Sequence, residues 1–117
     1  MRRWMAANGY GATPLWVTEY GILMPAEYGF PPARVAAFLT ASFDYFRTAC
    51  NPALGLAADG GRLVQRWLWF SAYAPSYPTG DLFTADGRPT PIMDALADYL
   101  AAHPTVGAGC RAGNALP

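Results

Sequence analysis

The residue of this chain with the clearest chemical potential is Glu19. It lies in residues 14–20 (PLWVTEY), whose aromatic and β-branched residues between a proline and a following glycine predict a short buried strand. Side chains alternate across a strand, so Glu19 shares a face with Val17, while Tyr20 shares the other face with Thr18. An unpaired charge in line with apolar side chains is costly. Glu19 is therefore either a reactive carboxylate, or a structural one that pairs with an arginine or caps a neighbouring loop.

Helices and a second strand must position this group. Residues 2–8 are typical of the last turns of a helix, with Gly9 available for the left-handed cap. Apolar residues at helical spacing predict a helix over 31–48 and another over 91–103, each opened by proline. Residues 64–72 predict a second strand that is apolar on both faces, which is typical of a parallel sheet covered by helices.

The order of these elements indicates two βα units preceded by the end of a helix. We expect residues 1–104 to be the structured segment and the glycine-rich tail, residues 105–117, to be mobile. Two parallel strands cannot bury both of their faces alone. The sheet is therefore expected to need copies of this chain or further protein to cover it, and a helix without an N-terminal cap suggests a chain cut from a longer one.

Composition narrows the classes of function. The chain has 117 residues, a formal net charge of zero and 53% hydrophobic residues, which argues for a globular domain and against a nucleic-acid or anionic-membrane partner. No membrane span or signal peptide is predicted, and localisation stays open. Cys50 and Cys110 are far apart in sequence and lie near no histidine, since the only one is His103, so neither a metal nor a cofactor is predicted. His103 itself is expected to cap the end of a helix. Two unpaired thiols are expected, with one disulfide as the alternative.

Three stretches together resemble the retaining glycoside hydrolases that share a (β/α)8 barrel. PLWVTEYG (14–21) is similar to their seventh strand, which ends in the nucleophilic glutamate, and RLVQRWLWFSAY (62–73) is similar to their eighth strand. GDLFTADGRPTPIMDAL (80–96) resembles their last loop and last helix. The resemblance covers residues 1–103 and implies an α/β fold class, a partial TIM (β/α)8 barrel that carries the seventh and eighth βα units.

The resemblance also implies roles for individual residues. Glu19 would be the nucleophile, one of two carboxyl groups that such enzymes hold about 5 to 5.5 Å apart. Trp69 would lie beneath the substrate sugar, although a tryptophan on a buried strand is often simple core, as we expect for Trp67 one step deeper. Further substrate contacts are expected from Tyr20, for which plain packing is the alternative, and from Ser71, Tyr73 and Asp81.

The second carboxyl group departs from the family pattern. The family's proton donor is a glutamate that usually follows an asparagine on the fourth strand, but this chain has no Asn-Glu pair, and its other glutamate, Glu27, lies in a loop where we expect it to be solvated. We therefore predict the C-terminal fragment of a retaining glycoside hydrolase, inactive alone, with a carbohydrate substrate and with the remainder of the barrel or self-association covering its sheet. The alternative is a non-catalytic α/β carbohydrate-binding or assembly module that oligomerises.

Overall fold

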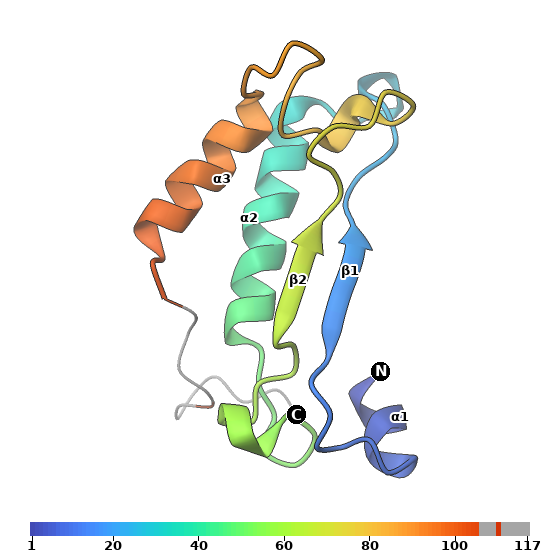
Figure 1. Cartoon of the computed structure of the whole chain (residues 1–117), viewed down its shortest axis with the longest axis vertical. Coiled ribbons are helices and arrows are strands. Elements are labelled where there is room, and N and C mark those ends of the chain that lie inside the picture. Colours follow the sequence, from blue (N-terminus) through green and yellow to red (C-terminus); the bar gives the residue numbers. More distant parts are fainter. Residues whose placement is uncertain (106–109, 111–117) are drawn as a thin grey trace. The chain divides into compact units, whose positions relative to one another are not determined.

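A computed structural model describes residues 1–105 and 110 (Figure 1). The helices and strands are α1 (Arg2–Ala7), β1 (Trp16–Tyr20), α2 (Pro32–Thr48), β2 (Arg66–Trp69) and α3 (Pro91–Ala102). Short 3-10 helices lie at Ala26–Tyr28, Ala57–Asp59 and Pro78–Gly80. Each predicted helix and strand is found, although both strands are shorter than expected.

The partial (β/α)8 barrel is wrong as a description of this fold. Within the described residues β1 and β2 are the only strands, and they pair as an open two-stranded parallel sheet. A barrel closes because eight strands pair in a ring. Here the β-forming stretches pair over only four or five residues, and helices and irregular loops make up most of the remaining described chain.

The chain divides into two compact units, which we describe separately. Among the described residues, unit 1 contains 1–17, 43–67, 105 and 110, and unit 2 contains 18–42 and 68–104. All six residues predicted to form the site belong to unit 2. The tail, predicted to be mobile, lies outside the described residues except at Thr105 and Cys110.

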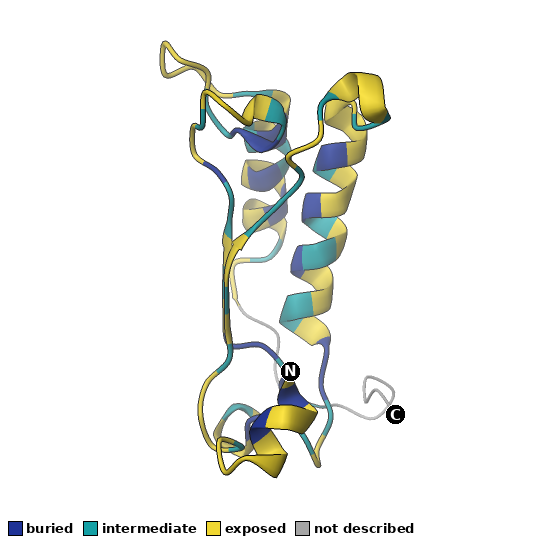
Figure 2. Cartoon of the chain, turned by 90° about the vertical axis from the view of Figure 1, so that its right-hand side faces the viewer, coloured by how far each residue is buried: buried dark blue, intermediate teal, exposed yellow. Residues whose placement is uncertain are grey.

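Unit 2 has a core built from one side of α2 and one side of α3. Val35 and Leu39, one helical turn apart, are completely buried on α2. On α3 the buried residues are Ile92, Leu96 and Tyr99. Figure 2 shows the buried positions recurring along one side of α2, with exposed positions on the other.

The N-terminus of α3 is capped by a threonine. The Oγ of Thr90 accepts hydrogen bonds from the N–H groups of Ile92 at 3.2 Å and Met93 at 3.4 Å. Pro91, which follows the cap, has no N–H group to satisfy.

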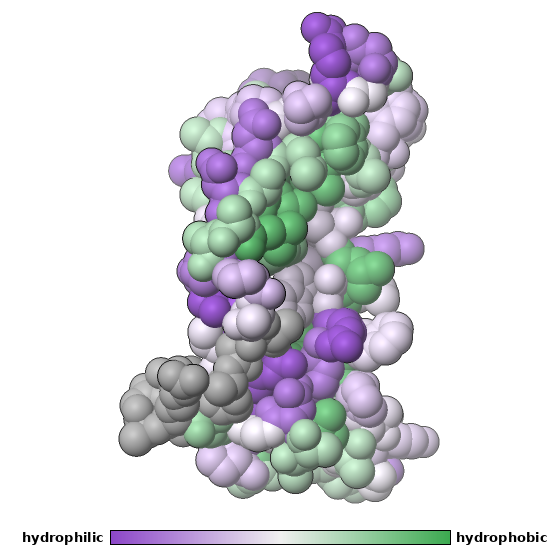
Figure 3. Space-filling view, turned by 60° about the vertical axis from the view of Figure 1, so that its left-hand side comes forward, coloured by the Kyte–Doolittle hydropathy of each residue, from purple (hydrophilic) through white to green (hydrophobic). Residues whose placement is uncertain are grey.

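Hydrophobic side chains gather on the side of unit 2 that carries α3, as Figure 3 shows.

Unit 1 is held by a buried arginine as well as by aromatic packing. The guanidinium of Arg2 donates to the carbonyl oxygens of Leu63 (2.7 Å) and Thr13 (2.9 Å) and to the side chain of Gln65. Burial lowers the pKa of Arg2, and the nearby Asp59 opposes this shift.

The aromatic part of unit 1 surrounds Trp67. Its ring lies 5.7 Å from Phe43 and 5.7 Å from Phe46, both on α2. The tilted and edge-on ring geometries are the ones that aromatic pairs favour. Trp67 is a packing residue, as predicted.

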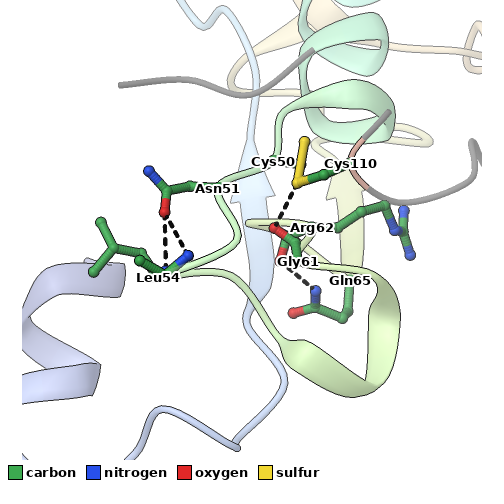
Figure 4. The surroundings of a disulfide bond; sticks show 8 residues. Cys50, Asn51, Leu54, Gly61, Arg62, Gln65 and Cys110 are labelled. Carbon is green, nitrogen blue, oxygen red and sulfur yellow. Dashed lines mark hydrogen bonds between the residues drawn. A yellow bond between two sulfur atoms is a disulfide. The ribbon is translucent and has the colours of Figure 1, made fainter. Parts of the chain in front are cut away.

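Cys50 and Cys110 form a disulfide, so the expectation of two unpaired thiols is wrong (Figure 4). Their Cα atoms lie 5.4 Å apart, within the range that a disulfide spans. Gly60 and Gly61 both have positive φ, and the N–H of Cys110 donates to the Gly60 carbonyl at 2.7 Å. This turn brings together two cysteines 60 positions apart, and nothing in their sequence spacing predicts the pairing.

The strands are not buried on both faces within the described chain, which corrects the prediction that the first strand is buried. In unit 2, Thr18 is exposed and Leu68 is 52% exposed. In unit 1, Trp16 is 61% exposed. The helix α2 lies on one side of the sheet (Figures 1 and 2), and these strand residues remain largely exposed.

Candidate functional site

Glu19 has an unusual backbone conformation. Its φ is +55°, and it is the one residue other than glycine with positive φ in the described part of the chain. The left-handed region costs an L-residue roughly 1–2 kcal/mol, because its Cβ approaches the following carbonyl oxygen. Non-glycine residues held in this region are frequent at functional sites. The observation marks Glu19 independently of any sequence motif.

The same conformation changes where Tyr20 points. Strict alternation predicts that Tyr20 shares the exposed face of Thr18, but the Tyr20 hydroxyl lies 3.2 Å from the Oγ of Ser42 on α2. The left-handed residue between them breaks the alternation, so that prediction is wrong. Burial raises the pKa of Tyr20 to about 12, although the hydrogen bond with Ser42 acts in the opposite direction.

Glu19 lines a cavity of about 300 Å³ within unit 2. Glu19 is exposed, whereas the sequence predicted that it lies in a buried strand. Among residues 1–105 and 110, no hydrogen bond or ion pair engages that carboxylate, so the structural alternative for Glu19 gains no support there. The cavity is lined by Glu19, Tyr20, Gly21, Leu23, Phe70 and Tyr77.

Trp69 is packed within unit 2 and does not line this cavity. Its ring meets Tyr20 edge-on at 5.5 Å and Phe38 at 6.1 Å, and its indole N–H donates to the Gly80 carbonyl at 2.7 Å. A Cβ added to Gly80 would lie 3.5 Å from the same ring. These contacts favour the core alternative for Trp69.

Ser71 and Asp81 bind each other inside unit 2. The Ser71 hydroxyl donates to Asp81 at 2.6 Å, and both residues are buried. The N–H of Ala74 lies 3.0 Å from both carboxylate oxygens of Asp81. The two polar groups proposed for substrate contacts therefore make internal hydrogen bonds, whereas Tyr73 is half exposed.

Sequence reasoning missed four residues of the cavity wall, namely Gly21, Leu23, Phe70 and Tyr77. Tyr77 had a detectable signal, because it is an aromatic residue that directly precedes Pro78 in a loop after a predicted strand. Phe70 was hidden within an apolar run that reads equally well as core. Leu23 carries no polar group and gave no signal.

A second carboxyl group is not found in the cavity wall, whose described residues include only one acid, Glu19. Glu27 lies in the 3-10 helix Ala26–Tyr28 and is exposed, as predicted. No group of three metal-ligating side chains occurs within the described ranges. His103 is the C-cap residue of α3, again as predicted, and its Nδ1 lies 2.9 Å from the Tyr99 carbonyl oxygen.

Comparisons with known protein families, curated proteins and solved structures found no match to this chain. The resemblance to retaining glycoside hydrolases therefore rests on the sequence motifs alone. Separately, none of the described helices is both long enough and apolar enough to cross a membrane.

Proposed function

We propose that this chain is the C-terminal part of a retaining glycoside hydrolase and that Glu19 is its nucleophile. The supporting observation is the left-handed Glu19, the last residue but one of β1, which lines a cavity made mainly by apolar and aromatic residues. A carboxylate that served only to end a strand would gain nothing from a conformation that favours glycine.

The chemistry requires an ionised carboxylate beside the anomeric carbon. In the first step an oxygen of Glu19 forms a bond to that carbon, while the bond to the leaving oxygen breaks and its electron pair departs with the leaving group. A second carboxyl group normally gives that oxygen a proton. Since the cavity wall includes no other acid among the described residues, we infer that the proton donor comes from protein outside this chain.

A reagent that needs no proton donor tests the nucleophile directly. In 2,4-dinitrophenyl 2-deoxy-2-fluoroglycosides the phenolate leaves without protonation, and the fluorine slows hydrolysis of the glycosyl–enzyme ester. We expect gluco- or xylo-configured reagents to attach one sugar to Glu19, as measured by intact mass and peptide mapping.

Glu27 provides the matched control, because it is the only other glutamate and is also exposed. The variant Glu19→Gln should lose the adduct, and Glu27→Gln should keep it. Labelling that survives Glu19→Gln would refute the assignment. Separately, turnover of an ordinary aryl glycoside by the chain alone, dependent on Glu19, would show that no external proton donor is required.

The exposed sheet face favours a second candidate, a non-catalytic carbohydrate-binding or assembly module. Leu68 in unit 2 and Trp16 in unit 1 are more than half exposed on the strands, and a second copy of the chain would be one way to cover them. Light scattering combined with thermal unfolding tests this candidate. A discrete oligomer that melts cooperatively and is never labelled at Glu19 would favour the module over the enzyme.

A further inference from the structure

We propose that Tyr77 is the aromatic wall on which a sugar ring stacks beside Glu19, and that the buried Ser71–Asp81 pair positions it. The inference rests on the proposed function, because it assigns a carbohydrate to the cavity that Glu19 lines. It also moves the stacking role away from Trp69, whose ring and indole N–H are engaged by other groups of unit 2.

The composition of the cavity identifies the kind of ligand. Apart from Glu19 its wall is made by a glycine, a leucine and three aromatic residues. Tyr20 directs its hydroxyl to Ser42, which leaves Tyr77 as the half-exposed aromatic residue of the wall, with 51% of its surface accessible. Rings of this kind stack on the C–H faces of pyranoses, and a tyrosine keeps its hydroxyl in water while doing so.

The size of the cavity limits the ligand to a small sugar. About 300 Å³ lies at the lower end of the range of roughly 300–1,000 Å³ that small-molecule sites span. One pyranose unit fits such a volume. A pyranoside with equatorial hydroxyl groups, of gluco or xylo configuration, offers the flattest C–H faces to Tyr77.

Hydrogen bonds at its base hold the loop that carries Tyr77. Asp81, which is 4% exposed, accepts from the Ser71 hydroxyl and from the N–H of Ala74. The N–H of Leu82 donates to the Ser71 carbonyl at 3.0 Å.

The loop is also fixed next to its apex. The N–H of Tyr77 donates to the Ala74 carbonyl at 2.9 Å, which forms a turn, and Pro78 follows directly. Asp81 therefore binds the residue on which the Tyr77 turn is built. The acid acts as a positioning residue, which is why its carboxylate is buried away from solvent.

The experiment measures sugar binding by the full chain without any chemistry. Methyl β-D-glucopyranoside and methyl β-D-xylopyranoside are titrated against the chain and observed by saturation-transfer NMR. Tyr77→Ala should weaken binding about two- to tenfold, the range expected for a lost aromatic stack, whereas Tyr77→Phe should retain it. Tyr73→Ala is the matched control, because Tyr73 is 48% exposed on the same loop but does not line the cavity.

The positioning role has its own readout, the hydrogen exchange of the Ala74 amide. Asp81→Asn should speed that exchange and weaken sugar binding together, whereas Tyr77→Ala should weaken binding and leave the amide protected. Equal losses from Tyr73→Ala and Tyr77→Ala, or no binding of either sugar, would overturn the inference. If Glu19 is labelled but sugar binding does not depend on Tyr77, only the stacking role of Tyr77 is refuted. If binding depends on Tyr77 but Glu19 is never labelled, only the assignment of Glu19 as nucleophile is refuted.

Discussion

Replacing Glu19 by glycine should stabilise the chain even though it deletes the group proposed to react. A residue with a Cβ at the observed φ of +55° destabilises the folded state by roughly 1–2 kcal/mol. Glycine removes that cost, but it lowers the stability by roughly 0.5–1 kcal/mol relative to alanine, because a glycine gives the unfolded chain more conformational freedom. Relative to Glu19→Ala, which keeps a Cβ, Glu19→Gly should therefore be more stable by about 0.5–1 kcal/mol.

Thermal melts followed by circular dichroism measure this difference. With an unfolding entropy of about 2.1 cal/mol/K per residue, a chain of 117 residues should show a gain in melting temperature of about 2–4 °C. Thr18, exposed on the same strand and without positive φ, provides the control, since Thr18→Gly should be less stable than Thr18→Ala. A Glu19→Gly variant less stable than Glu19→Ala would refute the reasoning about strain.

Three further predictions concern the core, the disulfide and pH. Leu39→Ala, at a fully buried site, should lower the free energy of unfolding by about 2–5 kcal/mol in urea titrations, whereas Leu100→Ala, at a half-exposed site, should change it by about 0.5 kcal/mol or less. Alkylation without reductant should find no free thiol. Cys110→Ala should lower the free energy of unfolding by about 4 kcal/mol, because Cys50 and Cys110 close a loop of 60 residues. The raised pKa of Tyr20 means that its protonated form is favoured by folding, so its contribution to stability should be complete below about pH 10 and lost as pH rises towards about 12. Melts across this range should show a smaller decline for Tyr20→Phe than for the unchanged chain.

Local elements were predictable because local patterns determine them. The helical spacing of apolar residues and the Thr-Pro start predicted α3 correctly. The turn-forming residues on either side of the two β-forming stretches located both strands. How the strands assemble was not predictable in the same way. Whether a strand apolar on both faces becomes buried depends on what covers it, and in the described chain Leu68 remains half exposed. The barrel prediction failed at this step, from strand to sheet.

The site was partly predictable for the same reason. Glu19 was identified from its residue type within an apolar strand, and the structure adds its left-handed backbone, which no alternation rule contains. Ser71 and Asp81 were correctly placed after the second strand, but position alone could not distinguish a side chain that meets a ligand from one that binds a loop. That distinction depends on the N–H of Ala74, three residues beyond Ser71 and seven before Asp81.

The conformation of Glu19 is more informative than its residue type. Gly21, two residues later, shows that the chain uses glycine where backbones approach closely, since a Cβ there would collide with the Phe70 carbonyl oxygen. At position 19 the chain instead holds an exposed glutamate in a conformation that glycine adopts at lower cost. Within the described residues the carboxylate has no polar partner that would repay this cost. The role proposed for Glu19, a carboxylate directed at a bound ligand, would account for both facts.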